Sequence, residues 1–258
     1  MRSPERLRAL VEERLAGLEL APSLGGLGEA VRYSLDGGGK RIRPVLCLAT
    51  TEAAGGRPED ALDAACALEL IHSFSLVHDD LPALDDDEER RGRPTVHVRF
   101  GEAQAILAGD ALMAEAFRLA SRYPEELRLE LLEATAGMIG GQYLDIEAAP
   151  VDRLELNELK TGRLFDASVG CALWVAGVPP ASQRAWRDFG AEFGRLFQVV
   201  DDLLDGDGLV QERGREATVA LSEETEARAR ASLDELDAET AVLEELLGEL
   251  AARQQSSV

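Results

Sequence analysis

Apolar residues recur along most of this chain at the three- and four-residue spacing of helices. In the first stretch, Ser3 and Pro4 have the residue types of a helix cap and a first helical position. Leu7, Val11 and Leu18 then follow one apolar stripe. No stretch of the sequence alternates apolar and polar residues in the way that predicts a strand. The pattern therefore predicts an all-α protein.

Further helices are expected wherever this spacing returns. They cover residues 27–35, 45–54, 61–78, 103–121, 127–139, 165–178 and 185–204, with a solvated acidic hairpin over 223–253 and a short polar tail. The glycine pair at 140–141 is expected to end one helix, with polar connections at 142–145 and 208–217. Because no linker or low-complexity segment interrupts the series, we predict a single helical domain over residues 1–258.

Composition and charge exclude several classes of function. The formal net charge of the 258 residues is -22, which argues against a nucleic-acid partner. The three cysteines lie far apart among apolar neighbours, as expected for buried thiols in a reducing compartment. The longest apolar run, at 169–178, is well short of the roughly 20 residues of a membrane-spanning helix, and no leader-like segment opens the chain. We therefore predict a cytoplasmic protein without stable membrane insertion.

Two aspartate clusters are the strongest chemical signal in the sequence. The first contains Asp79, Asp80 and Asp85 directly after an apolar run, and a second cluster follows another apolar run at 201–205. Neighbouring carboxylates repel one another unless a cation lies between them, and hard oxygen donors suit Mg²⁺. One such cluster is equally well explained by a solvated acidic turn. Two of them indicate the two sides of one metal site.

Helix geometry allows each cluster to face one side. Gln198 and the second cluster are spaced i, i+3, i+4 and i+7, so they share a helix face. In the first cluster, Pro82 biases the residue before it out of the α region, so the helix should end or bend near Asp80. That break lets Asp79 and Asp85, which are six residues apart, face a single ion.

A glycine-rich basic loop, D-G-G-G-K-R-I-R-P, runs from Asp36 to Pro44. Its glycines allow a ligand to approach the backbone closely, and Lys40, Arg41 and Arg43 supply positive charge. The loop lacks the G-x-x-x-x-G-K-[ST] spacing of a P-loop. A glycine-ended helix followed by solvated basic residues is the alternative interpretation.

In combination these segments resemble the trans-type isoprenyl diphosphate synthases, or polyprenyl synthetases, and most of all the bacterial farnesyl diphosphate synthases. The resemblance is carried, in order, by the strings G-G-K-R-I-R-P, S-L-V-H-D-D-L-P-A-L-D-D-D-E-E-R-R-G-R-P-T-x-H, G-G-Q-x-L-D, K-T-G-R-L and F-Q-V-V-D-D-L-L-D. It implies an all-α bundle around a deep central cavity, a homodimer, and Mg²⁺-dependent head-to-tail condensation of isopentenyl diphosphate with an allylic diphosphate.

The resemblance also implies roles for individual residues. The ligands of Mg²⁺ bound to the allylic diphosphate would be Asp79, Asp80, Asp85, Asp201, Asp202 and Asp205. The same diphosphate would be contacted by Arg90, and isopentenyl diphosphate by Lys40, Arg43, His72 and Arg91. The allylic diphosphate and the developing carbocation would be supported by Lys160, Thr161 and Gln198.

Product length is expected to depend on the residues just before the first cluster. In the resembling family the fifth residue before the first aspartate is a gate, and here it is Phe74. An aromatic gate together with the Leu-Pro insertion inside the motif is the farnesyl-type pattern. Ser75 is small and, by helix geometry, lies more directly beneath the metal. We expect farnesyl diphosphate as the product, with geranylgeranyl diphosphate as the alternative.

After the second cluster the chain departs from the family pattern. The lysine-containing elements G-K-x-x-G-x-D and K-x-T are replaced by D-G-D-G-L-V-Q-E-R-G-R-E-A-T, where Arg213 or Arg215 is the available cation. Two other hypotheses stay open. One is a class I terpene cyclase, which is disfavoured because a cyclase has no second diphosphate for Lys40, Arg43, His72 and Arg91 to bind. The other is a non-catalytic partner subunit or an acidic cation-binding protein. His72 is expected to bind substrate, His78 to pack or to orient a carboxylate, and His97 to be structural.

Overall fold

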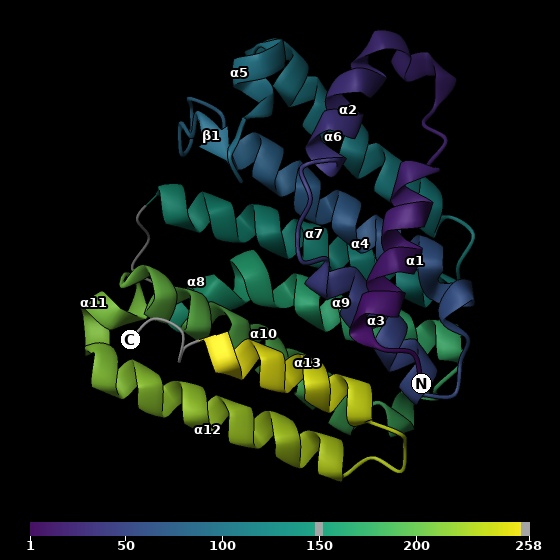
Figure 1. Cartoon of the computed structure of the whole chain (residues 1–258), viewed down its shortest axis with the longest axis vertical. Coiled ribbons are helices and arrows are strands. Elements are labelled where there is room, and N and C mark those ends of the chain that lie inside the picture. The colour runs from purple at the N-terminus through teal and green to yellow at the C-terminus, as the bar shows by residue number, and fades with distance from the viewer. Residues whose placement is uncertain (148–151, 254–258) are drawn as a thin grey trace.

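The computed structural model describes residues 1–147 and 152–253, which form a bundle of helices (Figure 1). The α-helices are α1 (Pro4–Ala16), α2 (Gly28–Leu35), α3 (Ile42–Ala53), α4 (Pro58–Asp79), α5 (Val96–Phe100), α6 (Glu102–Ala120), α7 (Glu125–Ile146), α8 (Arg153–Asn157), α9 (Arg163–Ala176), α10 (Arg184–Asp205), α11 (Leu209–Arg213), α12 (Arg215–Asp234) and α13 (Ala241–Ala252). Shorter helical segments are the 3-10 helices η1 (Pro22–Leu27) and η3 (Pro180–Ser182) and the π-helical turn η2 (Glu158–Gly162). The predicted all-α fold is confirmed.

The centre of the bundle is built around α4. This helix packs against α3, α6 and α9, and its apolar residues lie on all of its sides, as expected for a helix inside a bundle. α9 packs in turn against α10, where Phe165, Phe189 and Phe193 are fully buried. The predicted helices at 45–54, 61–78, 103–121 and 185–204 agree with α3, α4, α6 and α10 to within three residues at each end. Among the described residues, no helix combines the length and hydropathy that crossing a bilayer requires.

The prediction that a helix ends at Gly140 and Gly141 is wrong. α7 continues through both glycines to Ile146, so residues 142–145 are helical and do not form a polar connection. A Cβ atom on Gly141 would lie 2.9 Å from the backbone nitrogen of Lys160. The missing side chain therefore allows η2 to pack closely on α7, and the glycine serves helix packing instead of chain reversal.

The C-terminal hairpin is present, but it begins earlier and is more buried than expected. α11 and the start of α12 occupy the 208–217 segment, which was expected to be a polar connection. α13 buries Leu243, Leu247 and Leu250 and packs against α10 and α12, so this half of the hairpin is not simply solvated. The acidic residues of α13 occupy its other face and obscured the apolar stripe. The predicted polar tail after Arg253 lies outside the described residues.

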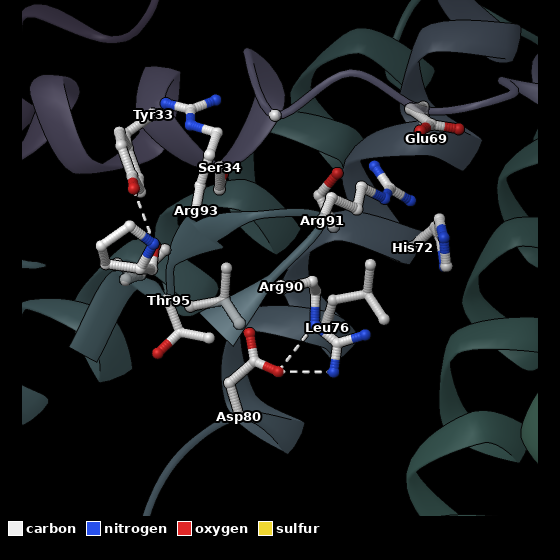
Figure 2. A pocket seen from close by; sticks show the side chains of 15 residues that line it. Tyr33, Ser34, Glu69, His72, Leu76, Asp80, Arg90, Arg91, Arg93 and Thr95 are labelled. Atoms are coloured by element: carbon white, nitrogen blue, oxygen red, sulfur yellow. Dashed lines mark hydrogen bonds and ion pairs between the residues drawn. The ribbon is translucent and has the colours of Figure 1, made fainter. Parts of the chain in front are cut away.

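A short antiparallel pair that the sequence pattern did not predict follows the first aspartate cluster. It consists of β1 (Glu89–Arg90) and β2 (Arg93–Pro94). The turn between the strands has φ of 55° at Arg91 and 74° at the glycine after it, in the left-handed region that tight hairpins use. The hydroxyl of Tyr33, on α2, donates to the Pro94 carbonyl oxygen at 2.7 Å and ties the hairpin to the bundle (Figure 2).

Candidate active site

The first aspartate cluster lies where α4 ends. α4 stops at Asp79, and the chain turns back so that the Asp85 N–H donates to the Asp79 carbonyl oxygen at 2.9 Å. The break that Pro82 predicted is therefore present. Burial, and then the charge of Asp85, raise the pKa of Asp79 to about 6. These two carboxylates lie close enough to repel each other, as expected for a pair that holds a cation.

The second cluster repeats this arrangement at the end of α10. Asp201 and Asp205 are four residues apart on one helix face, and α10 ends at Asp205 and is capped by Gly206, whose φ of 72° is left-handed. Burial, and then the charge of Asp205, raise the pKa of Asp201 to about 6. In both clusters the first and last aspartates thus form a mutually repelling pair in which the first member is largely buried.

The middle aspartate of each cluster makes contacts that stabilise the fold. Asp80, with 5% of its side chain exposed, accepts a hydrogen bond from Nε of Arg90 at 2.7 Å, and Nη2 of Arg90 forms an ion pair of 2.5 Å with the same carboxylate oxygen (Figure 2). Asp202 accepts the backbone N–H of Leu209 at 3.0 Å, at the start of α11. A Cβ atom on Gly208 would lie 2.6 Å from Asp202 Oδ2, so this glycine allows the contact. The outer aspartates are therefore the freer metal donors.

The donor set of the outer aspartates fits Mg²⁺. Mg²⁺ in proteins usually binds one or two carboxylates together with waters and substrate phosphate oxygens. In the described part of the chain, only the exposed Glu5, Glu245 and Glu249 bring three potential metal-ligand atoms within 4.8 Å of one another. The aspartate clusters are more open than that, so oxygens of a diphosphate would be needed to complete the coordination of an ion there.

Arg43 is influenced by acidic residues of two helices, α4 and α10. Its guanidinium carbon lies 4.4 Å from the centroid of the Phe165 ring, and its buried Nε has no partner among the described residues. Burial lowers the pKa of Arg43 to about 10, against the opposing charges of Glu69 on α4 and Asp201 on α10. A buried N–H without a partner is rare in folded proteins and is available to an anionic ligand.

Arg90, Arg91 and His72 line one cavity between the β-hairpin and α4 (Figure 2). Arg91 donates to the carbonyl oxygen of Gly38 and so reaches from the hairpin to the glycine-rich loop. A Cβ atom on Gly39, whose φ is 144°, would lie 2.7 Å from Nη1 of Arg91. Burial, and then Arg43, lower the pKa of His72 well below its ordinary value, so its ring is neutral in this basic cavity.

The structure does not bring Lys40 into the cavity of Figure 2. Lys40 lines a different cavity together with Arg253. Burial and the charge of Arg253 lower the pKa of Lys40, whereas the charge of Asp201 raises it. Lys40 therefore interacts with the second aspartate cluster and not with the first. The neighbouring Arg41 is a structural residue, because it is buried and forms an ion pair of 2.7 Å with Glu69. Of the predicted isopentenyl diphosphate set, His72 and Arg91 thus line the cavity of Figure 2, whereas Lys40 lines another one.

Lys160 and Thr161 lie on η2, the π-helical turn before α9. Nζ of Lys160 is 2.5 Å from Oδ2 of Asp145, on α7. The charge of Lys160 opposes the rise in the pKa of Asp79, and both residues line the same cavity. No role for Asp145 is predicted from the sequence, although it ends the string G-G-Q-x-L-D, because the expected structure around it is a polar connection.

An elongated cavity extends from Asp79 and Lys160 between α4 and α7. Its volume is about 290 Å³, and both Phe74 and Ser75 line it, together with apolar side chains of α7 such as Met138. The cavity therefore has charged groups at one end and an apolar wall along its length. This shape suits a ligand with an anionic head and a hydrocarbon chain.

Gln198 does not line that elongated cavity. It lines a smaller one on the other side of η2, together with Asn157 and Asp166. Oδ1 of Asp166 is buried and has no partner among the described residues. The structure therefore separates Gln198 from the cavity that Lys160 lines, although the sequence placed both in one catalytic set.

Asp166 should make the stability of the protein depend on pH. Burial, and then the charge of Glu158, raise the pKa of Asp166 to about 7. A carboxyl whose pKa is higher in the folded than in the unfolded state loses stabilisation as pH rises, here between about pH 4 and pH 7. We expect Asp166→Asn to be more stable than the wild type at pH 8 by roughly 1–3 kcal/mol, and equal to it at pH 4. Denaturant unfolding at both pH values measures this, and a difference that does not change with pH would contradict it.

The comparisons with known proteins agree with this geometry. A family model described as polyprenyl synthetase matches residues 26–254. The chain belongs to the polyprenyl synthetase family. It is 43% identical over 206 residues to the farnesyl diphosphate synthase of Geobacillus stearothermophilus, covering 73% of this chain and 69% of that one. It is 42% identical over 193 residues to the geranylgeranyl diphosphate synthase of Cyanophora paradoxa, covering 69% of this chain and 64% of that one.

Solved structures of this family have the same fold along nearly the whole chain. The geranyltranstransferase of Thermotoga maritima aligns with a TM-score of 0.86 at 29% identity, covering 98% of this chain and 99% of that one. The expectation of a short-chain trans-prenyltransferase is thus confirmed at the level of the family. That residues 1–258 form one such domain stays a prediction.

Two arginines connect the segment after the second aspartate cluster, which departs from the family pattern, to the rest of the protein. Nη1 of Arg215 donates to the Leu203 carbonyl oxygen at 3.0 Å, at the end of α10. Nη2 of Arg213 lies 3.4 Å from Oδ2 of Asp152. Both arginines contact the protein itself, so neither is free to bind a phosphate unless these contacts are exchanged.

Proposed function

We propose that this polyprenyl synthetase condenses isopentenyl diphosphate with an allylic diphosphate, head to tail, and that farnesyl diphosphate is its main product. The observation that carries the proposal is the pair of aspartate clusters, each with a largely buried first aspartate whose pKa is raised to about 6. Basic residues surround both, and an apolar cavity begins beside Asp79. An anionic head bound between the clusters would have its hydrocarbon chain in that cavity.

The residues present have the chemistry that ionisation of an allylic diphosphate requires. Breaking the C–O bond leaves an allylic carbocation and a diphosphate anion, whose charge must be absorbed by positive groups. Mg²⁺ held by Asp79, Asp85, Asp201 and Asp205 would supply most of that charge when bound. Arg90 and Lys160 add positive charge at the first cluster. Water would trap the cation, so the bound hydrocarbon chain would have to cover Ile139, Tyr143 and Ile146, which line the cavity and are 51–60% exposed.

A second basic set distinguishes this proposal from a terpene cyclase. His72 and Arg91 line the cavity of Figure 2, and Arg43 has a buried N–H without a partner. A cyclase acts on one diphosphate and has no use for this second set. We propose that the set binds isopentenyl diphosphate, whose alkene attacks the allylic carbon and then loses a proton, with the departed diphosphate as the acceptor.

An elongation assay tests the proposed function. Purified protein is incubated with Mg²⁺, labelled isopentenyl diphosphate, and either dimethylallyl, geranyl or farnesyl diphosphate, and the products are sized. We expect Mg²⁺-dependent elongation that stops mainly at fifteen carbons. A main product of twenty carbons would favour geranylgeranyl diphosphate as the product. A product formed from the allylic diphosphate alone would favour a cyclase, and no elongation with any primer would refute the proposal.

Phe74 should limit the length of the product. Phe74 is 6% exposed and lines the elongated cavity. We expect Phe74→Ala to extend the cavity and to move the main product at least one isoprene unit longer, with turnover reduced by less than about tenfold. Product sizing by chromatography measures this, with Phe100→Ala, outside the cavity, as the control. An unchanged distribution would remove Phe74 from the gating role.

A homodimer is also part of the proposal. Val98, Ile106 and Leu107 on α5 and α6 are large apolar side chains that are 46–53% exposed. A second copy of the chain would cover them. We expect Leu107→Glu to change a dimer into a monomer in analytical ultracentrifugation, and a monomeric wild type would contradict the proposal.

The three cysteines are buried and unpaired, which supports the proposed cytoplasmic location.

A further inference from the structure

His78, the residue before the first aspartate cluster, braces the gate residue Phe74 against α6. The two rings meet edge to face, with centroids 5.4 Å apart and planes at 86°. On its other side, Nε2 of His78 lies 3.0 Å from the carbonyl oxygen of Ile106, on α6. Because a carbonyl oxygen only accepts, Nε2 must carry the proton in this contact. Phe74 and His78 line the same elongated cavity.

Gly109, on α6, provides the space in which the His78 ring lies. A Cβ atom built on Gly109 would overlap the ring, and even Cε1, the farthest of the three nearest ring atoms, would lie 2.9 Å away. Gly109 is buried inside a regular helix and does not have a positive φ. Its lack of a side chain is therefore required by the ring of His78, and the backbone conformation does not demand it.

We propose that Gly109 and His78 determine product length together with Phe74. The inference rests on the proposed function and deepens it, because it assigns the limit of chain elongation to a contact between α4 and α6. A side chain at position 109 displaces the His78 ring toward the cavity and shortens it. Removal of the His78 ring leaves Phe74 without its support, and the Phe74 side chain then yields to a longer product.

The two positions are expected to act in opposite directions. In the elongation assay, Gly109→Ala should shift the ratio of longer to shorter product about fivefold toward the shorter one. His78→Ala should shift the same ratio about fivefold toward the longer one. In the double variant the effect of Gly109→Ala should disappear, because the ring with which the new methyl group collides is gone.

A matched control is available on α7. Gly140 is also a helical glycine, but a Cβ atom built there would meet nothing within 4 Å. We expect Gly140→Ala to leave the product ratio unchanged. KM for the allylic primer and kcat are measured for each variant, because a general loss of folding or activity lowers kcat without altering the ratio of products.

The wild-type reaction separates this inference from the proposed function. A wild type that does not elongate refutes both. A wild type that elongates, with a product ratio that Gly109→Ala leaves unchanged, overturns the inference alone. An equal effect of Gly109→Ala with and without His78 also overturns it. If Gly109→Ala does not fold, as judged by its thermal melt, His78→Ala decides, and an unchanged ratio in that variant overturns the inference.

Discussion

Replacing Asp201 with asparagine is expected to lower kcat/KM by about 10²–10³-fold. Asp201 is largely buried, and burial and Asp205 raise its pKa to about 6, so its charge is costly unless a cation compensates it. Asparagine keeps the shape of the side chain but removes the negative charge that holds Mg²⁺. Initial rates of elongation at several Mg²⁺ concentrations measure the effect, which should lessen at high Mg²⁺.

Asp207 supplies the matched control for this substitution. It lies close to the second cluster, but its side chain is exposed and has no place in the proposed metal site. Asp207→Asn makes the same chemical change and removes the same charge from the protein. We expect its rate to stay within about twofold of the wild type. An equal loss in Asp201→Asn and Asp207→Asn would show that the general charge of this end of the bundle matters, and the site as proposed would be wrong.

Replacing Arg90 with alanine is expected to reduce both stability and activity, and the two losses can be separated. Nε of Arg90 donates to Asp80 at 2.7 Å, Nη2 forms an ion pair of 2.5 Å with the same oxygen, and only 5% of the Asp80 side chain is exposed. Without Arg90 that carboxylate is buried and unpaired, which should cost roughly 2 kcal/mol of unfolding free energy. The elongation rate should fall by about 10²-fold, because a positive charge beside the allylic diphosphate is lost.

The double variant Arg90→Ala with Asp80→Asn separates the two losses. Asparagine removes the unpaired charge, so we expect about half of the lost stability to return. The rate should not return, because the positive charge of Arg90 is still missing. Denaturant unfolding and elongation kinetics on the same samples measure both. A rate that recovers along with stability would mean that Arg90 acts only by holding Asp80 in place.

Much of the fold follows from local patterns in the sequence. The helical spacing predicts α3, α4, α6 and α10 to within three residues because each of these helices buries a wide apolar surface. Pro82 predicts the end of α4, since a residue before proline avoids the helical region. The glycine pair at 140–141 leads to a wrong prediction because glycine can either end a helix or allow another segment to pack closely on it. Only the position of Lys160 on η2, next to Gly141, shows which of the two applies.

The candidate site is predictable in its residue types and less so in its distances. The spacing within α10 places Asp201 and Asp205 on one face. Lys40 and Gln198 line cavities separate from those of the residues with which the sequence groups them. No local pattern in the sequence predicts this separation, because it depends on how α3, α10 and η2 pack. The contact of His78 with Gly109 joins residues 31 positions apart and likewise has no local signal.

The proposed mechanism requires both aspartate clusters to hold metal on the same diphosphate. Binding of Mn²⁺, followed by electron paramagnetic resonance with and without an unreactive allylic thiodiphosphate, tests it most directly. We expect the thiodiphosphate to strengthen Mn²⁺ binding in the wild type and in the control Asp86→Asn, which removes the same charge from the exposed residue next to Asp85. Both Asp79→Asn and Asp201→Asn should weaken that enhancement at least about tenfold. Enhancement that one of these two variants retains in full would contradict the claim, because the diphosphate would then be held by a single cluster.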